Sequence, residues 1–315
     1  MKSGSGEVFN SKILLFGEYS LMLGSMALSI PFGQFSGSFT THPDWKSDSE
    51  GKFSNDHLNK FASWLENMMD GNKSGFTLDV ERFKAEVKKG LVFNSNIPKG
   101  YGLGSSGALV AAVYSRYGEP LVTGMADASE IIVLKNFLAQ MESCFHGKCS
   151  GLDPLICYLK QPLLIQSDGM IKMVDLPEWQ ADKGGAVFLI DSGTSGKTQP
   201  LVDHFTGLCS NPQYLEMILS EYTPLVNNCI GAYCQNEPDL LMKKLENLSV
   251  MQMAHFAEMI PASVRLIWER GITSGKYILK LCGSGGGGMI LGFTRDFASA
   301  KEALGNQKIT FVHPL

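Results

Sequence analysis

Residues 98–108 read Pro-Lys-Gly-Tyr-Gly-Leu-Gly-Ser-Ser-Gly-Ala, a composition and spacing suited to binding a phosphate group. The alternating glycines give the backbone the freedom to turn several N–H groups toward one anion. Ser105 and Ser106 stand where the N-cap of a helix belongs, ahead of the apolar run 107–114. A helix N-terminus favours phosphate through its free N–H groups and its dipole. The sequence therefore predicts a phosphate-binding loop that leads into a helix.

Residues 102–107 also match the G-x-G-x-x-G spelling of dinucleotide-binding folds, although that spelling alone is a weak signal. In those folds the loop directly follows a buried strand, whereas here the polar, proline-containing segment 94–99 intervenes. The Gly-Lys-Ser/Thr ending of a Walker A loop is absent. On the loop alone, an ordinary glycine turn before a helix stays open as the alternative.

Two carboxylates further along the chain have positions that suggest chemistry. Glu142 falls in the last turn of a helix predicted at 127–145, where the helix dipole disfavours an acid. An exposed surface glutamate is the alternative. Asp153 ends the small-residue segment 146–153 and precedes a proline, which suits a catalytic base, a metal ligand or a helix cap.

The composition of the 315 residues, 44% hydrophobic and 18% charged, indicates a folded globular protein of one large or two moderate domains. The 27 basic and 31 acidic side chains give a net charge of −4, which does not favour a nucleic-acid partner. The seven cysteines form no C-x-x-C pair, and no apolar run is long enough for a signal peptide or a membrane span. We therefore expect a cytoplasmic protein with reduced thiols and no membrane partner.

The elements that must position these residues follow from apolar periodicity. Strands are predicted at 13–16, 27–32, 35–41, 76–80, 91–93, 186–190, 277–282, 289–293 and 309–312. Helices are predicted at 56–70, from 107 to about 118, at 127–145, between 214 and 270, and at 297–304.

Several details of this prediction bear on the site. Lys12 and Glu18 flank the first strand and could point into a cleft, although each, taken separately, is more often a surface charge. Asp127 or Ser129 is predicted to cap the helix at 127–145, and residues 44–55 are predicted to form a loop. The glycine run 283–288 fits either a close backbone approach or a second phosphate neighbour.

Three separated segments resemble the motifs of the GHMP kinase superfamily, which is named after galactokinase, homoserine kinase, mevalonate kinase and phosphomevalonate kinase. Residues 12–18, Lys-Ile-Leu-Leu-Phe-Gly-Glu, resemble the first motif; residues 98–107 resemble the phosphate loop; and residues 282–288, Cys-Gly-Ser-Gly-Gly-Gly-Gly, resemble the third. Within the superfamily, residues 146–153, His-Gly-x-x-Ser-Gly-x-Asp, are most similar to mevalonate kinase.

The resemblance implies an ATP-dependent kinase that phosphorylates the small-molecule alcohol mevalonate, with ATP and Mg²⁺ as cofactors. Asp153 would take the proton of the substrate hydroxyl with Lys12 beside it, because a nearby ammonium orients the alcohol and lowers its pKa. Ser106 and Glu142 would bind Mg²⁺, and Glu142 precedes Asp153 by eleven residues, as in the family. The phosphates of ATP would lie on Gly100, Gly102, Leu103, Gly104, Ser105, Ser106 and Gly107. Substrate contacts are expected at Glu18, Tyr19, His146, Thr198 and Gly285.

The fold implied by the resemblance is α/β (α+β), with two domains. Residues 1–180 would form an ATP-binding domain like the second domain of ribosomal protein S5, and residues 181–315 a ferredoxin-like domain. The nucleotide and the acceptor would meet in the cleft between them. A homodimer is compatible with the resemblance, and the sequence leaves the oligomeric state open.

One departure from the family pattern concerns the acceptor. Mevalonate kinases usually read Gly-Glu-His at the end of the first motif, whereas this chain has Gly17-Glu18-Tyr19, and Ser11 replaces a usual glycine. Gly-Glu-Tyr is also similar to phosphomevalonate kinases, which makes phosphomevalonate the alternative acceptor; another kinase of the superfamily, acting on a different small alcohol, is the further alternative. The related decarboxylase differs in its phosphate loop. Outside this superfamily, a nicotinamide-dependent oxidoreductase or a binding module without activity are the remaining alternatives.

Overall fold

The computed structural model describes residues 6–41, 44–71, 75–119, 128–147, 149–179 and 184–315. The chain forms two compact units that alternate along the sequence. Unit 1 comprises Met1–Lys12, Pro31–Pro98 and Gly104–Gln161, and unit 2 comprises Ile13–Ile30, Lys99–Leu103 and Pro162–Leu315. The sequence predicts two consecutive domains, residues 1–180 and 181–315. The two compact units alternate along the chain instead of following one another, and the boundary at residue 180 stays a prediction.

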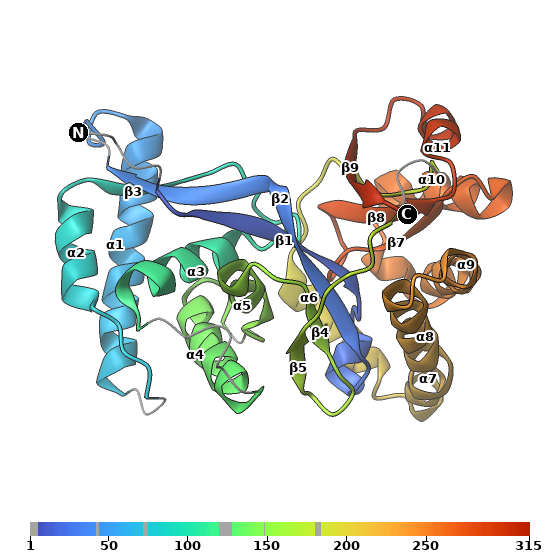
Figure 1. Ribbon diagram of the computed structural model, residues 1–315, viewed down its shortest axis with the longest axis horizontal. Helices are drawn as coiled ribbons and strands as arrows, with labels where there is room; N and C mark the ends of the chain where they lie inside the picture. The colour runs from blue at the N-terminus through green and yellow to red at the C-terminus, as the bar shows by residue number, and fades with distance from the viewer. Residues whose placement is uncertain (1–5, 42–43, 72–74, 120–127, 148, 180–183) are drawn as a thin grey trace. The chain divides into compact units, whose positions relative to one another are not determined.

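The described part of unit 1 combines a ribbon of strand segments, among them residues 8–12 of β1 (Val8–Phe16), with five helices, and Figure 1 shows these elements in blue to green. Within the ribbon, residues 37–41 of β2 (Ala27–Thr41) pair antiparallel with β3 (Leu91–Ser95), and Phe39 lies opposite Phe93. The helices are α1 (Ser49–Asp70), α2 (Val80–Lys88), α3 (Ser105–Tyr117), α4 (Ala128–His146) and α5 (Leu152–Leu159). Helix α3 is buried along most of its length, because residues 107–114 are apolar on all sides. Helices α4 and α5 both pack on α3 and on each other.

The first two helices of unit 1 differ from the sequence prediction. The loop predicted at 44–55 is wrong, because α1 begins at Ser49 and the Asp48 carboxylate accepts a hydrogen bond from the Gly51 N–H at 2.6 Å. The strand predicted at 76–80 is also wrong. That segment makes one isolated bridge and ends at Asp79, which caps α2 by accepting from the Arg82 N–H at 2.9 Å.

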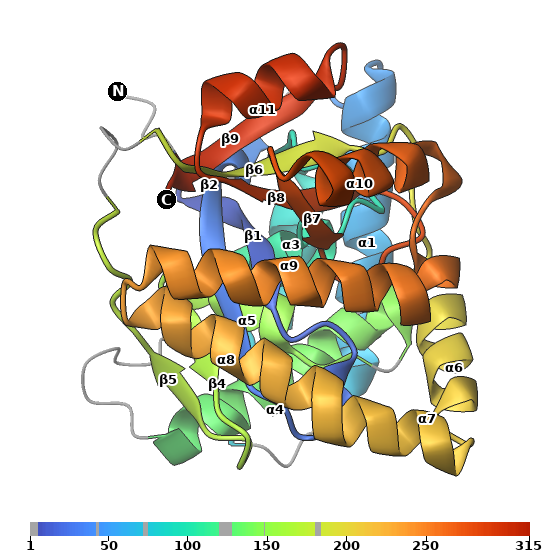
Figure 2. The ribbon, with the colours of Figure 1, turned by 90° about the vertical axis from the view of Figure 1, so that its right-hand side faces the viewer.

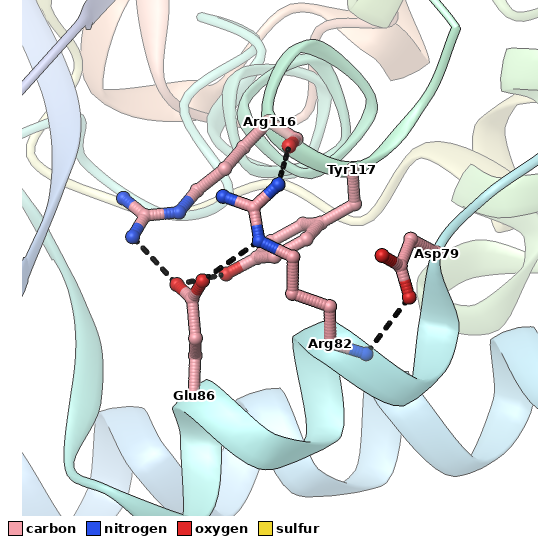
Figure 3. A network of polar contacts seen from close by, with 5 residues as sticks. All are labelled: Asp79, Arg82, Glu86, Arg116 and Tyr117. Carbon is pink, nitrogen blue, oxygen red and sulfur yellow. Dashed lines mark hydrogen bonds and ion pairs between the residues drawn. The ribbon is translucent and has the colours of Figure 1, made fainter.

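Helix α2, which the sequence analysis did not predict, is tied to the end of α3 by a polar network (Figure 3). The Glu86 carboxylate accepts hydrogen bonds from Arg82 on its own helix and from Arg116 and Tyr117 on α3. These bonds fix α2 against the C-terminal end of the helix whose N-terminus forms part of the candidate site.

Unit 2 contains the ends of two long strands. These are residues 13–16 of β1 (Val8–Phe16) and residues 27–30 of β2. They share a sheet with β4 (Leu163–Ile165) and β5 (Ile171–Met173), in which the strands lie side by side in the order β1-β2-β4-β5. The two strands predicted at 27–32 and 35–41 are one strand of 15 residues, because the backbone stays extended through Gly33. Ala27 to Ser29 pair antiparallel with β4, and β4 pairs antiparallel with β5.

The second sheet of unit 2 confirms the ferredoxin-like prediction. It consists of β6 (Ala186–Asp191), β7 (Ile278–Leu281), β8 (Met289–Thr294) and β9 (Ile309–Pro314). All pairs are antiparallel and the strand order is β7-β8-β6-β9, which with the intervening helices gives the βαββαβ arrangement. The strands predicted at 186–190, 277–282, 289–293 and 309–312 are therefore confirmed.

The helices of unit 2 are α6 (Thr198–Leu208), α7 (Pro212–Met217), α8 (Thr223–Cys234), α9 (Pro238–His255), α10 (Ala262–Ser274) and α11 (Phe297–Leu304). Figure 2 shows α8 and α9 side by side, and these two helices pack along their lengths. The helices predicted from 214 to 270 and at 297–304 are confirmed, whereas α6 was not predicted. No helix among the described residues is long and apolar enough to cross a lipid bilayer.

Candidate functional site

Unit 1 brings the predicted base and its lysine into direct contact. Lys12 lies on β1 and Asp153 lies in the first turn of α5, and Lys12 Nζ is 2.9 Å from Asp153 Oδ1. The Lys12 side chain is 6% exposed and that of Asp153 is 38% exposed. The ammonium is therefore enclosed, while the carboxylate it binds remains accessible to a second molecule.

The position of Asp153 depends on a close approach of α5 to α4. Gly151 precedes α5 with a φ of +77°, a left-handed conformation that glycine adopts without strain. A Cβ atom at this position would lie 2.1 Å from the Lys135 carbonyl oxygen of α4. The glycine therefore allows the first turn of α5 to lie against the helix that carries Glu142.

Glu142 is buried beside this ion pair. Its side chain accepts a hydrogen bond from the Ser106 hydroxyl on α3 at 2.8 Å, and the residue is 5% exposed. Burial, followed by the negative charge of Asp153, raises the pKa of Glu142 to about 7, against the opposing effects of the Ser106 hydrogen bond and Lys12. Two nearby carboxylates whose negative charge is only partly compensated by Lys12 make a site that favours an added cation.

The N-terminus of α3 lies against the same group. Gly104 is the N-cap, with a φ of +76°, and a Cβ there would lie 2.9 Å from Lys12 Cγ. The prediction that Ser105 or Ser106 is the N-cap is therefore wrong, because both belong to the first turn. The Ala108 N–H donates to the Gly104 carbonyl at 2.9 Å, which closes the first turn of α3, and the N–H groups before it in the helix are directed toward its N-terminal end. The first turn holds no acidic residue, which suits an anion.

Eight of the predicted site residues belong to unit 1, and six of them lie together. Around the Lys12–Asp153 pair lie Gly104, Ser106, Gly107 and Glu142. Ser105 is half-buried at the same helix end. His146 is the last residue of α4, and its side chain lies outside the part of the chain that the structure describes.

The N-terminal part of the phosphate loop, residues 99–103, belongs to unit 2 and lies against two other loops there. The Gly196 N–H donates to the Gly100 carbonyl at 2.9 Å. A Cβ on Gly102 would lie 3.0 Å from the Cys282 carbonyl oxygen, and one on Gly288 would lie 2.5 Å from Tyr101 Cα. Glycines are required at these points because the backbones themselves are in contact. Leu103 is buried, with 1% exposure.

The other predicted substrate residues of unit 2 lie around the glycine run 283–288. Thr198 is the first residue of α6, and its hydroxyl accepts a hydrogen bond from the Ser284 hydroxyl at 3.2 Å. Gly285 has a φ of +73°, and a Cβ there would lie 2.2 Å from the Met259 carbonyl oxygen. Tyr19 donates its hydroxyl proton to the Ser284 carbonyl. Glu18 forms an ion pair with Lys280, and the side chains of Glu18 and Lys280 are both wholly buried.

Sequence reasoning missed Lys280 and the turn 192–197. A signal for Lys280 exists, since a lysine inside the apolar run Ile278–Leu281 must find a partner if the strand is buried. The turn is polar, and its contact through the Gly196 N–H with the Gly100 carbonyl cannot be read from spacing.

The described residues contain no group of three or more histidine, cysteine, aspartate or glutamate side chains that could hold a metal ion. Ser106 and Glu142 nevertheless offer two oxygen atoms on adjacent helices. This small donor set fits Mg²⁺, which retains several water molecules and binds substrate phosphates through its other positions.

Residues 76–161 match the family described as the GHMP kinases N terminal domain. No curated protein sequence matches the chain.

Similar solved structures span nearly the whole chain at low identity. They include L. major mevalonate kinase in complex with R-mevalonate, with a TM-score of 0.64, 14% identity and coverage of 99% of this chain and 97% of that chain. Lactococcus lactis galactokinase complexed with galactose has a TM-score of 0.63 and 12% identity, covering 99% and 94%. Streptococcus pneumoniae phosphomevalonate kinase in complex with phosphomevalonate and AMPPNP has a TM-score of 0.60 and 14% identity, covering 95% of each chain. At these identities the likeness establishes a shared fold.

Proposed function

Since the chain belongs to the GHMP kinase superfamily through its N-terminal domain match, we propose that this ATP-dependent small-molecule kinase transfers the γ-phosphate of ATP to a hydroxyl group of mevalonate. The observation that carries the proposal is the contact between Lys12 and Asp153 beside Ser106 and Glu142. The segment 146–153, which resembles mevalonate kinases, supports mevalonate as the acceptor.

In the proposed reaction the acceptor hydroxyl oxygen forms a bond to the γ-phosphorus, and the bond from that phosphorus to the bridging oxygen of ADP breaks. The hydroxyl proton passes to the accessible Asp153 carboxylate. Lys12 keeps this carboxylate in place and offers positive charge near the forming alkoxide. Most of the acceleration would come from positioning and charge neutralisation, as in other phosphoryl transfers.

The N–H groups of the first turn of α3 support phosphate binding at Gly104 to Gly107. Ser106 and Glu142 would hold Mg²⁺, which would neutralise phosphate charge. A cation at this position would also stabilise the ionised form of Glu142, whose pKa is raised by burial and by Asp153.

Phosphomevalonate is the second candidate acceptor, and the Gly17-Glu18-Tyr19 sequence favours it. The two candidates differ by one phosphate group, which requires basic side chains to receive it. A direct comparison of acceptors therefore separates them.

The test is ADP release by the purified protein with Mg²⁺ and ATP, comparing mevalonate, phosphomevalonate, homoserine and galactose. Turnover with mevalonate alone supports the proposal, and preference for phosphomevalonate replaces the acceptor. Silence with all four acceptors contradicts the assigned substrate.

The role of Asp153 has its own test. Asp153→Asn should lower kcat by roughly 10²–10⁴-fold, because the proton acceptor is lost while the size of the side chain is kept. Binding of Mg·ATP should persist in this variant. Turnover close to that of the wild type, with the fold intact, would remove Asp153 from the mechanism.

A further inference from the structure

Tyr19 occupies an enclosed position in unit 2. The residue is 6% exposed, and its ring lies 4.8 Å from that of Phe205 and 5.6 Å from that of Phe256, measured between centroids. Its backbone has a φ of +62°, which residues other than glycine rarely adopt. The hydroxyl donates to the Ser284 carbonyl. Both the ring and the hydroxyl of Tyr19 are therefore engaged by the protein.

Glu18, the residue before Tyr19, binds the strand that leads into the glycine loop 283–288. Glu18 forms an ion pair with Lys280 on β7, and neither side chain is accessible to solvent. Lys280 also donates to the Leu281 carbonyl at 2.6 Å, two residues before the glycine loop 283–288. Two consecutive residues of the first motif thus attach to the strand that enters this loop and to a carbonyl within it.

The glycine loop in turn lies against the phosphate loop. The Cys282 carbonyl oxygen approaches the Cβ position of Gly102 to 3.0 Å, and the Met289 N–H donates to the Tyr101 carbonyl at 3.4 Å. Because the contacts are between backbones, a shift of the glycine loop displaces residues 100–103 as well.

We infer that Tyr19 is a positioning residue: its hydroxyl fixes the Ser284 carbonyl and thereby holds the glycine loop 283–288 against the phosphate loop. The inference rests on the proposed kinase function and assigns Tyr19 to the nucleotide side of the reaction rather than to the acceptor. On this inference Tyr19 does not distinguish mevalonate from phosphomevalonate, and the comparison of acceptors alone decides between them.

The test is Tyr19→Phe, which removes the hydroxyl and keeps the ring between Phe205 and Phe256. The KM for ATP and the Kd for Mg·ADP should both rise about three- to tenfold, the range expected for one net hydrogen bond. The KM for the acceptor should stay unchanged. Amide hydrogen exchange in the 282–289 peptide should become faster, because the loop has lost a fixed carbonyl.

Tyr277→Phe is the matched control, since the Tyr277 hydroxyl also donates to a backbone carbonyl, that of Ile267, at 2.8 Å in the same unit. This control should leave the ATP and ADP constants unchanged. A rise in the acceptor KM with an unchanged ATP KM in Tyr19→Phe overturns the inference, and so does unchanged exchange in the 282–289 peptide. The exchange and Mg·ADP measurements require no turnover, so they remain decisive if the proposed acceptor proves wrong.

Discussion

Glu142 is the residue whose proposed role depends most on a bound cation. It is buried, it accepts a hydrogen bond from Ser106, and its pKa is raised to about 7 by burial and by the charge of Asp153. Glu142→Gln keeps the shape and removes the charge that would bind Mg²⁺. We expect the Mg²⁺ concentration for half-maximal ADP release to rise about tenfold or more, because one charged ligand is lost.

Ser143→Ala is the control for this substitution. Ser143 lies next to Glu142 on α4, and its hydroxyl donates to the Gln140 carbonyl at 2.6 Å. The control should show the Mg²⁺ dependence of the wild type. A Glu142→Gln protein that loses turnover without any change in its Mg²⁺ requirement would contradict a ligand role.

At the residue scale, motif spacing could predict one part of the candidate site and not another. Lys12, Ser106, Glu142 and Asp153 belong to separate segments, yet each stands in a motif, and the structure brings them together in unit 1. Lys280 stands in none of the three motifs. Its partner Glu18 is 262 residues away, so no local pattern links the two charges.

At the scale of elements, the attachment of α2 to α3 makes stability depend on pH. Burial tends to raise the pKa of Glu86, but hydrogen bonds from Tyr117 and Arg116 outweigh it and lower the pKa from the ordinary value of 4.5. A lowered pKa in the folded state stabilises the fold above pH 4.5, and this contribution is lost as the pH falls through the folded value. Figure 3 shows the residues concerned.

Glu86→Gln should therefore lower the free energy of unfolding at pH 7 by about 1–2 kcal/mol, since charge-assisted hydrogen bonds are lost at a partly exposed site. The difference from the wild type should shrink as the pH is lowered toward 3. Urea denaturation at both pH values measures it. Glu81→Gln, on the same helix but 85% exposed, should change stability little at either pH. A deficit in Glu86→Gln that is constant with pH would mean that packing rather than ionisation is responsible.

Local patterns predicted the elements of unit 2 better than the start of unit 1. The strand predicted at 76–80 came from the alternation of Phe76, Leu78 and Val80, whereas Asp79 within that alternation is the cap of α2. A cap and an alternating strand are hard to distinguish over five residues. Strands β6 to β8 are buried on both faces and, apart from Lys280, consist mainly of apolar residues bounded by glycine or polar turns, which makes their existence and limits clear from the sequence.

At the scale of the whole molecule, the interleaving of the two units along the chain makes a specific prediction. The chain passes between the units after Lys12, Ile30, Pro98, Leu103 and Gln161. The chain passes from unit 2 to unit 1 between Leu103 and Gly104, within the predicted nucleotide site. A fragment of residues 1–180 would therefore contain unit 1 together with pieces of unit 2 that have lost their partners.

The consequence is clearest at the end of β1. Phe16 packs on Phe293 and Tyr233, with ring centroids 5.9 and 6.0 Å away, and Glu18 is paired with Lys280. In the 1–180 fragment these apolar contacts are missing and Glu18 lacks its counter-ion. Leaving an apolar ring and a buried charge without their partners destabilises a fold by several kcal/mol.

We therefore expect the 1–180 fragment to show no cooperative urea transition by circular dichroism, whereas the intact chain shows one. Coexpression with residues 181–315 should restore the transition, because every non-covalent partner of residues 13–30 and 99–103 is then present. A 1–180 fragment that unfolds cooperatively on its own would contradict this expectation and support residue 180 as the boundary of an independent domain. Restoration by the second fragment would instead place the cooperative folding unit in the whole chain, since β1 and β2 contribute residues to both units.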